Sequence, residues 1–156
     1  MLDTEFISEL AVAVLNGLQN KKKQLEEFYQ QYETSFDDAE RVRSLFLQVL
    51  GEIAQLLPNI AKTRWKKKSD FYTLFVTLAQ CQGQFPLSAE KRDLASRQLV
   101  DFGGAVDTAI RAEREEGVAI PPRVEEYVRY VERAASDLGN RQQRERILKD
   151  VLTAIF

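Results

Sequence analysis

The sequence of 156 residues contains no histidine and a single cysteine, Cys81. Without histidine, the chain lacks the commonest general base, the histidine-paired serine and cysteine nucleophiles, and every zinc site that uses an imidazole. One cysteine excludes an internal disulfide and is typical of proteins that work in a reducing cytosol. We therefore expect a cytoplasmic protein that is not an enzyme and that uses no metal or other cofactor.

Long apolar runs are also missing. No stretch approaches the ~18 consecutive apolar residues that suggest a membrane-spanning helix, and no signal-peptide pattern opens the chain. The phosphate-loop, dinucleotide-binding and Cys-x-x-Cys motifs are absent as well. We therefore expect no membrane partner and no nucleotide-binding loop of these kinds.

What the chain does have is the composition of a folded protein, with 44% hydrophobic and 29% charged residues. Apolar residues recur every three to four positions along most of its length, and no stretch shows the sustained alternation of strands. Short loops between these segments favour antiparallel neighbours. The sequence predicts an all-α fold, with residues 1–156 forming a single compact domain of six to seven mostly antiparallel helices.

Two of the predicted helices bear on later arguments. One runs over about 70–82, and Ser69 is its expected N-cap. The other runs over about 88–116 and contains the pair Gly103 and Gly104. We expect this pair either to kink the helix or to permit close packing against it.

The charge is unevenly distributed, although the net charge is only −2. Residues 61–92 carry seven basic and two acidic side chains, whereas residues 1–60 carry five basic and ten acidic ones. The densest basic stretch contains five cations, at Lys62, Arg64, Lys66, Lys67 and Lys68. Lysines beside a helix N-terminus oppose the helix dipole, so they do little for the helix that follows. Two interpretations stay open: a grip for DNA phosphates with Trp65 stacked on a base, or a solvated turn with Trp65 in the core.

Two other basic groups are candidate contacts. Lys21, Lys22 and Lys23 lie in the expected turn after the first helix, where cations also stabilise a helix C-terminus. Arg141 and Arg144 are three residues apart and share one face of the last helix. Each group could bind phosphates or the carboxylates of a partner. Each also has a structural alternative, either solvating a turn or pairing with carboxylates of the same chain.

Three blocks of sequence resemble a known family. They are residues 6–10 with 21–29, residues 64–75 (RWKKKSDFYTLF), and an ending with Tyr127 and residues 140–144. Together they are similar to the helical region that follows the ParB/sulfiredoxin-like domain in GmrSD-type restriction proteins. The resemblance implies a role in bacterial anti-phage defence against modified DNA. It also implies a partner, which is a nuclease or ParB/sulfiredoxin-like domain of the same system. The family's Asp-Gly-Gln-Gln-Arg-like motif and its HNH nuclease site are absent here, so no catalytic residue carries over.

We therefore expect a non-catalytic accessory domain that packs on partner domains as a scaffold, through Trp65 or the apolar end at Ile155 and Phe156. The alternative is a DNA-contacting module, in which the basic patch around residues 62–68 meets the phosphates of double-stranded DNA with help from residues 21–23. The scaffold hypothesis predicts an exposed apolar patch. The DNA hypothesis predicts that the two basic groups lie on one face of the molecule.

Overall fold

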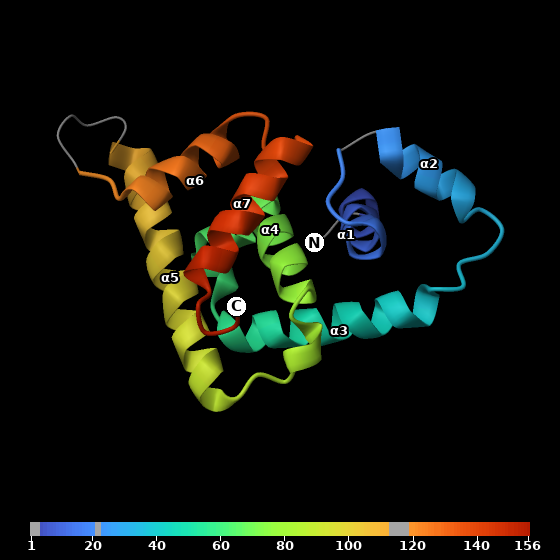
Figure 1. Cartoon of the computed structure of the whole chain (residues 1–156), viewed down its shortest axis with the longest axis horizontal. Coiled ribbons are helices and arrows are strands. Elements are labelled where there is room, and N and C mark those ends of the chain that lie inside the picture. Colours follow the sequence, from blue (N-terminus) through green and yellow to red (C-terminus); the bar gives the residue numbers. More distant parts are fainter. Residues whose placement is uncertain (1–3, 21–22, 113–118) are drawn as a thin grey trace.

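The fold is built from helices alone in the part of the chain that the structure, a computed structural model, describes: residues 4–20, 23–112 and 119–156 (Figure 1). The predicted all-α class is confirmed, with seven α-helices among these residues. Their bounds are Thr4–Asn16 (α1), Lys23–Gln31 (α2), Ala39–Leu56 (α3), Lys68–Ala79 (α4), Ala89–Ala112 (α5), Pro122–Glu132 (α6) and Leu138–Val151 (α7). Short 3-10 helices occupy Ile60–Lys62, Arg64–Lys66 and Gln82–Gln84. None of the described helices is both long enough and apolar enough to cross a membrane.

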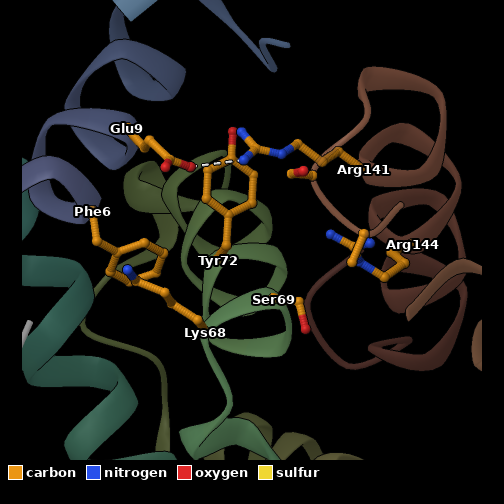
Figure 2. Close-up of a pocket in the computed structure, with 9 residues that line it drawn as sticks. Phe6, Glu9, Lys68, Ser69, Tyr72, Arg141 and Arg144 are labelled. Carbon is orange, nitrogen blue, oxygen red and sulfur yellow. Dashed lines mark hydrogen bonds and ion pairs between the residues drawn. The ribbon is translucent and has the colours of Figure 1, made fainter. Parts of the chain in front are cut away.

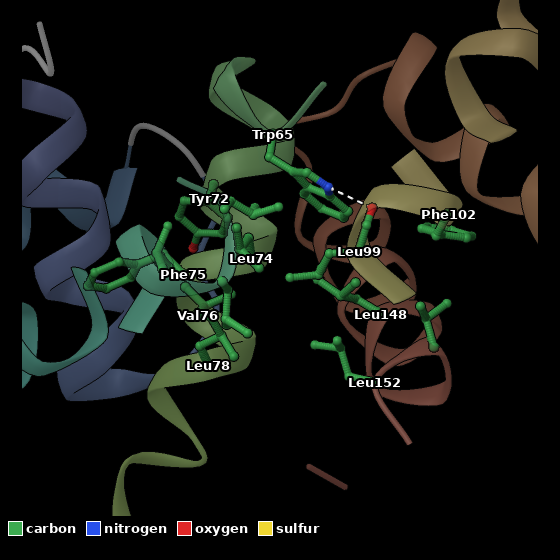
Figure 3. Packing of buried hydrophobic residues seen from close by; sticks show 14 of the residues in the cluster. Trp65, Tyr72, Leu74, Phe75, Val76, Leu78, Leu99, Phe102, Leu148 and Leu152 are labelled. Atoms are coloured by element: carbon green, nitrogen blue, oxygen red, sulfur yellow. Dashed lines mark hydrogen bonds between the residues drawn. The ribbon is translucent and has the colours of Figure 1, made fainter. Parts of the chain in front are cut away.

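Helix α4 lies at the centre of the core, because it packs against α1, α3 and α7. All residues from 72 to 78 are buried, so this helix is enclosed around its whole circumference and not along a single stripe. On one side Phe75 packs against Phe46 of α3, with ring centroids 4.7 Å apart. Across the core, Figure 3 shows Leu148 of α7 and Leu152, the residue that follows this helix, in the same apolar cluster.

The start of α4 differs from the sequence prediction. The helix begins at Lys68, so Ser69 lies inside its first turn, Lys67 occupies the N-cap position, and Lys67 makes no side-chain capping bond. The capping prediction for Ser69 is therefore wrong. The preceding backbone is ordered instead by Thr63, whose hydroxyl oxygen accepts a hydrogen bond from the backbone N–H of Trp65. Burial of the two residues at 64 and 65, and not a capping side chain, sets where this helix starts.

Helix α5 packs closely on the loop that precedes α4. A Cβ atom placed on Gly103 would lie 3.0 Å from Nε1 of Trp65, whereas one placed on Gly104 would meet nothing within 4 Å. Only a residue without a side chain lets the indole approach α5 this closely. Of the two roles expected for the glycine pair, close packing is confirmed at Gly103.

Candidate functional site

Arg64 belongs to the predicted contact set, but its side chain is buried and bound by two carboxylates. Its Nη2 donates to Oδ2 of Asp70 and its Nη1 to Oδ1 of Asp107, both at 2.9 Å. Asp70 is fully buried and also accepts a hydrogen bond of 2.9 Å from the hydroxyl of Tyr127. Burial, reinforced by the Asp70 charge, raises the pKa of Tyr127 well above its usual value, so the phenol keeps the proton that it donates. Arg64 therefore ties the 64–70 segment to α5 and α6 and is not available to a phosphate.

Trp65 is also part of the core. Its side chain has no exposed surface, and its indole N–H donates a hydrogen bond of 2.9 Å to the carbonyl oxygen of Leu99 (Figure 3). A buried indole can neither stack on a base nor contact a partner protein. The predicted contact roles of Arg64 and Trp65 are therefore corrected: both side chains are anchors, and of the two interpretations the core placement of Trp65 is the one that the structure adopts.

The lysines of the same segment point the other way. Lys62, Lys66, Lys67 and Lys68 are exposed, and we call residues 60–68 with these four side chains the lysine loop. Nζ of Lys67 lies 3.4 Å from Oδ1 of Asp107, the same oxygen that accepts from Arg64. No described carboxylate pairs with Lys62 or Lys66. The loop thus places two residues inward and presents four cations outward.

A pocket of about 250 Å³ lies beside the lysine loop, between α1, α4 and the chain that leads into α7 (Figure 2). We call it the cationic pocket, because three of its lining residues are cations and one is a carboxylate. Its lining residues are Phe6, Glu9, Lys68, Ser69, Tyr72, Ala135, Ser136, Arg141 and Arg144. The structure therefore brings together Lys68 and the two arginines of α7, which are more than 70 residues apart in the sequence.

Arg141 is buried at one end of the cationic pocket and its charge is balanced. Its Nη2 donates to Oε2 of Glu9 at 2.7 Å, and its Nη1 donates to the carbonyl oxygen of Gln19 at 3.2 Å. The guanidinium lies 4.0 Å from the ring centroid of Tyr72, within the range of a cation–π contact. The exposed contact role predicted for Arg141 is therefore corrected: it pairs with a carboxylate of its own chain, which is the structural alternative.

Arg144 is fully buried but has no such partner. Its Nε donates to Oγ1 of Thr73 at 3.0 Å and its Nη1 to the carbonyl oxygen of Tyr130 at 2.8 Å, and both acceptors are neutral. Among the described residues, no carboxylate forms an ion pair with it and no acceptor is bound by its Nη2. Burial lowers the pKa of the Arg144 guanidinium, as expected for a cation removed from water. An exposed role for Arg144 is excluded, and the carboxylate that acts on its charge is that of Asp70.

Glu9, Ser69, Tyr72 and Ser136 were not predicted as site residues. For Glu9 a signal was present, since it falls on the same face of α1 as Phe6, Leu10 and Ala13, which are buried. A carboxylate on an apolar helix face indicates a buried cationic partner. No comparable pattern singles out the two serines.

A second hollow, the α1–α2 groove, has a different character. Its volume is about 200 Å³, and its lining is almost wholly apolar or aromatic. The lining residues are Ser8, Ala11, Val12, Leu15, Leu25, Phe28, Tyr29, Tyr32 and Phe36. The scaffold hypothesis placed its contact elsewhere, at Trp65 and at Ile155 and Phe156. Trp65 and Ile155 are buried, and only Phe156 is exposed.

One of the predicted basic groups lies outside the described residues. Lys21 and Lys22 lie outside the described residues, and so does the side chain of Lys23, so the shared face expected for the two basic groups stays a prediction.

Within the described ranges, no cluster of cysteine, aspartate and glutamate side chains could hold a metal ion. Cys81 is buried, and burial raises the pKa of its thiol to about 11.

The three sequence blocks on which the expected family resemblance rests each contribute residues to the cationic pocket. Residues 6 and 9 come from the first block, residues 68, 69 and 72 from the second, and residues 141 and 144 from the third. Comparisons with protein families, with well-described proteins and with solved structures give no match. The function is therefore proposed from the geometry of the lysine loop and of the two hollows.

Proposed function

We propose that this chain is a non-catalytic helical domain that contacts the phosphate backbone of double-stranded DNA, as part of a bacterial anti-phage restriction system. The observation that supports the DNA contact is the lysine loop, where Lys62, Lys66, Lys67 and Lys68 are exposed while Arg64 and Trp65 are buried. The restriction system is proposed on the resemblance to GmrSD-type proteins.

The lysine loop suits phosphates better than bases. Lysine is a flexible point charge without the planar, bidentate geometry with which arginine reads guanine. The stretch is also locally basic in a chain whose net charge is −2, so we expect attraction to DNA at this surface and not over the whole molecule. We therefore expect contact that is independent of sequence and sensitive to salt.

The size of the salt effect follows from the number of lysines. Each neutralised phosphate contributes about −0.9 to the slope of log K against log salt, so four lysines predict a slope of about −3.6. Between 50 and 200 mM salt this amounts to about a 100-fold loss of affinity. Fluorescence anisotropy of a labelled duplex, titrated with the full chain at both salt concentrations, measures it.

Two triple variants distinguish DNA binding by the lysine loop from attraction to the overall charge of the protein. Replacing Lys62, Lys66 and Lys67 with glutamine leaves one lysine of the loop and should reduce the slope to about −1. Replacing three exposed arginines elsewhere changes the net charge equally and should leave the slope near its original value; Arg43, Arg97 and Arg133 serve as these control positions. Absence of binding at low salt, or an equal effect of both triple variants, would refute the proposal.

A scaffold role is the second candidate, and the α1–α2 groove favours it. The occupant that fits is an amphipathic helix of the nuclease or ParB/sulfiredoxin-like domain of the same system, with basic residues beside its apolar face. The groove belongs to the segment 1–60, which carries ten acidic and five basic side chains, so a basic rim would be attracted to it. Tyr29 and Phe36 line the groove and are exposed. Replacing both with serine should abolish binding to the purified partner domain and leave DNA affinity unchanged; unchanged partner binding would exclude the groove.

A further inference from the structure

Asp107 of helix α5 lies beside the lysine loop and pairs with one of its cations. Its Oδ1 is 3.4 Å from Nζ of Lys67 and 2.9 Å from Nη1 of Arg64. We propose that Asp107 competes with DNA phosphates for Lys67, and that it thereby holds the DNA affinity of the lysine loop below the level that the lysines alone would give. This inference rests on the proposed DNA contact and assigns a residue that sets its strength.

The position of Asp107 is fixed from the core. The buried Arg64 side chain binds Asp107 with one terminal nitrogen and Asp70 with the other. Asp70 also accepts a hydrogen bond from the hydroxyl of Tyr127. Side chains locked by such contacts keep their geometry when a ligand arrives. The Asp107 side chain is 34% exposed, so its charge acts on an anion that binds the lysine loop.

Lys67 is the partner that can move. Its backbone is fixed, because its N–H donates to the carbonyl oxygen of Arg64 at 2.9 Å and its own carbonyl oxygen accepts from Phe71 at 2.8 Å. Its side chain is half exposed, and the 3.4 Å to Asp107 is longer than the about 2.7–2.9 Å of a strong hydrogen bond between charged groups. The ammonium group can therefore exchange Asp107 for a phosphate without any change in the backbone.

Contact between a phosphate and Lys67 has two electrostatic costs while Asp107 is present. The ammonium group leaves the carboxylate or shares its charge between two anions, so attraction within the pair is lost. The phosphate also comes to lie near a carboxylate of like charge, which repels it. An exposed ion pair changes an equilibrium constant by up to a factor of about five, and we expect an effect of this size on DNA affinity.

The other exposed lysines of the loop are not equivalent to Lys67. No described carboxylate pairs with Lys62 or Lys66, so these two side chains attract phosphates without such a competitor. Lys67 still contacts a phosphate, but the loss of its pair with Asp107 offsets part of the affinity gained. The contact made by this domain alone is therefore weak. It gains strength when a partner domain holds the DNA nearby, because a tethered site acts at a high effective concentration.

Asp107→Asn tests the inference, because it removes the charge and keeps the shape of the side chain. The amide oxygen of asparagine still accepts from Arg64, whereas the ionic attraction to Lys67 is lost. We titrate a labelled duplex with the full chain at about 50 mM salt and follow fluorescence anisotropy. The variant should bind about fivefold more tightly than the unmodified chain. Circular dichroism and the emission of Trp65 check that the lysine loop is still packed.

A purely structural role of Asp107 predicts the opposite sign. If this carboxylate served only to hold Arg64, its replacement would loosen the lysine loop and weaken DNA binding. Weaker or unchanged binding by Asp107→Asn would therefore overturn the proposal.

Asp101 offers a matched control on the same helix. It is exposed, it precedes Asp107 by six residues, which places it about 120° away around the helix axis, and no described cation pairs with it. Asp101→Asn makes the same change in net charge and should alter DNA affinity by less than about twofold. Equal gains in the two variants would indicate a general effect of net charge and would also overturn the proposal.

A double-mutant cycle with Lys67→Gln separates competition from direct repulsion of the DNA. In the Lys67→Gln background Asp107 has no lysine to withhold from the phosphate. Adding Asp107→Asn to this background should therefore raise DNA affinity by less than about twofold. A gain as large as that in the unmodified background would mean that Asp107 acts on the DNA directly, and competition for Lys67 would be refuted.

Failure of this inference and failure of the proposed DNA contact give different results. If neither the unmodified chain nor Asp107→Asn binds the duplex at about 50 mM salt, the DNA contact is refuted and this inference is refuted with it. If the unmodified chain binds, and the triple variant of Lys62, Lys66 and Lys67 loses this binding, the DNA contact is supported. The affinity of Asp107→Asn relative to its two controls then decides the inference alone.

Discussion

Alanine replacement of Gly103 and of Gly104, one at a time, should have opposite effects on stability, although these residues are neighbours in α5. A Cβ on Gly103 would lie 3.0 Å from Nε1 and 3.5 Å from Cε2 of Trp65, closer than ordinary van der Waals contact in the first case. A Cβ on Gly104 would meet no atom within 4 Å. The pair therefore separates the effect of helix propensity from the effect of contact with the buried indole.

The magnitudes follow from these contacts. Alanine favours a helix over glycine by about 1 kcal/mol at either position, so Gly104→Ala should stabilise the protein by roughly that amount. At Gly103 the indole has no room to retreat, because Trp65 is fully buried and its N–H is bound to Leu99. Overpacking costs about 1–3 kcal/mol, and weakening a buried hydrogen bond adds about 1 kcal/mol. After the propensity gain, Gly103→Ala should destabilise by about 2 kcal/mol, a difference of about 3 kcal/mol between the variants.

Urea unfolding followed by circular dichroism measures both free energies of unfolding. Trp65 is the only tryptophan, so its fluorescence reports on this contact alone. Its emission should shift to longer wavelength in Gly103→Ala and stay unchanged in Gly104→Ala. If both variants gain stability equally and both keep the original emission, the loop is not anchored through this contact and the reasoning fails.

Three other predictions concern the buried network, the lysine loop and Cys81. Asp70→Ala should destabilise by about 3 kcal/mol in urea unfolding, because Arg64 would keep only the partly exposed Asp107; a loss below about 1 kcal/mol would contradict this. The triple glutamine variant of Lys62, Lys66 and Lys67 should keep its stability within about 0.5 kcal/mol, since these side chains are exposed; a larger loss would give them a structural role. Burial raises the pKa of Cys81 from 9.0 to about 11, so the thiol's contribution to stability should be lost as pH rises through this range. Cys81→Ala should therefore show a smaller alkaline loss in thermal melts, and an identical loss would count against it.

The fold class could be predicted because helical periodicity is a local signal. Apolar spacing identified the helices, whereas the glycine pair left a kink and close packing open, and the structure shows close packing at Gly103. The start of α4 could not be predicted in the same way, because Arg64 and Trp65 are fixed by residues on α5 that only the tertiary structure brings near. Ser69 has the side chain of a good N-cap, but that burial places it one residue into the helix.

The site was predicted less well, since the sequence gives no direct sign of long-range pairing. Arg64 pairs with Asp107, which is 43 residues away in the sequence, and Arg141 pairs with Glu9, which is 132 residues away. Because the sequence does not show that such distant residues are in contact, these arginines were interpreted as exposed cations. Helical periodicity contained one signal of burial, because Arg144 lies on the same stripe of α7 as the buried Leu148 and Val151. A cation on an apolar stripe indicates burial, whereas the lysines of 62–68 follow no such stripe.

The two inward residues of the lysine loop also affect the entropy of binding. Ordering a free loop costs about 1–2 kcal/mol per residue in backbone freedom, and a ligand that orders such a loop loses that amount of affinity. Here the indole and guanidinium have already fixed the backbone during folding, so only the lysine side chains lose freedom when an anion binds. Anything that loosens either anchor should therefore weaken anion binding without removing a single positive charge from the surface.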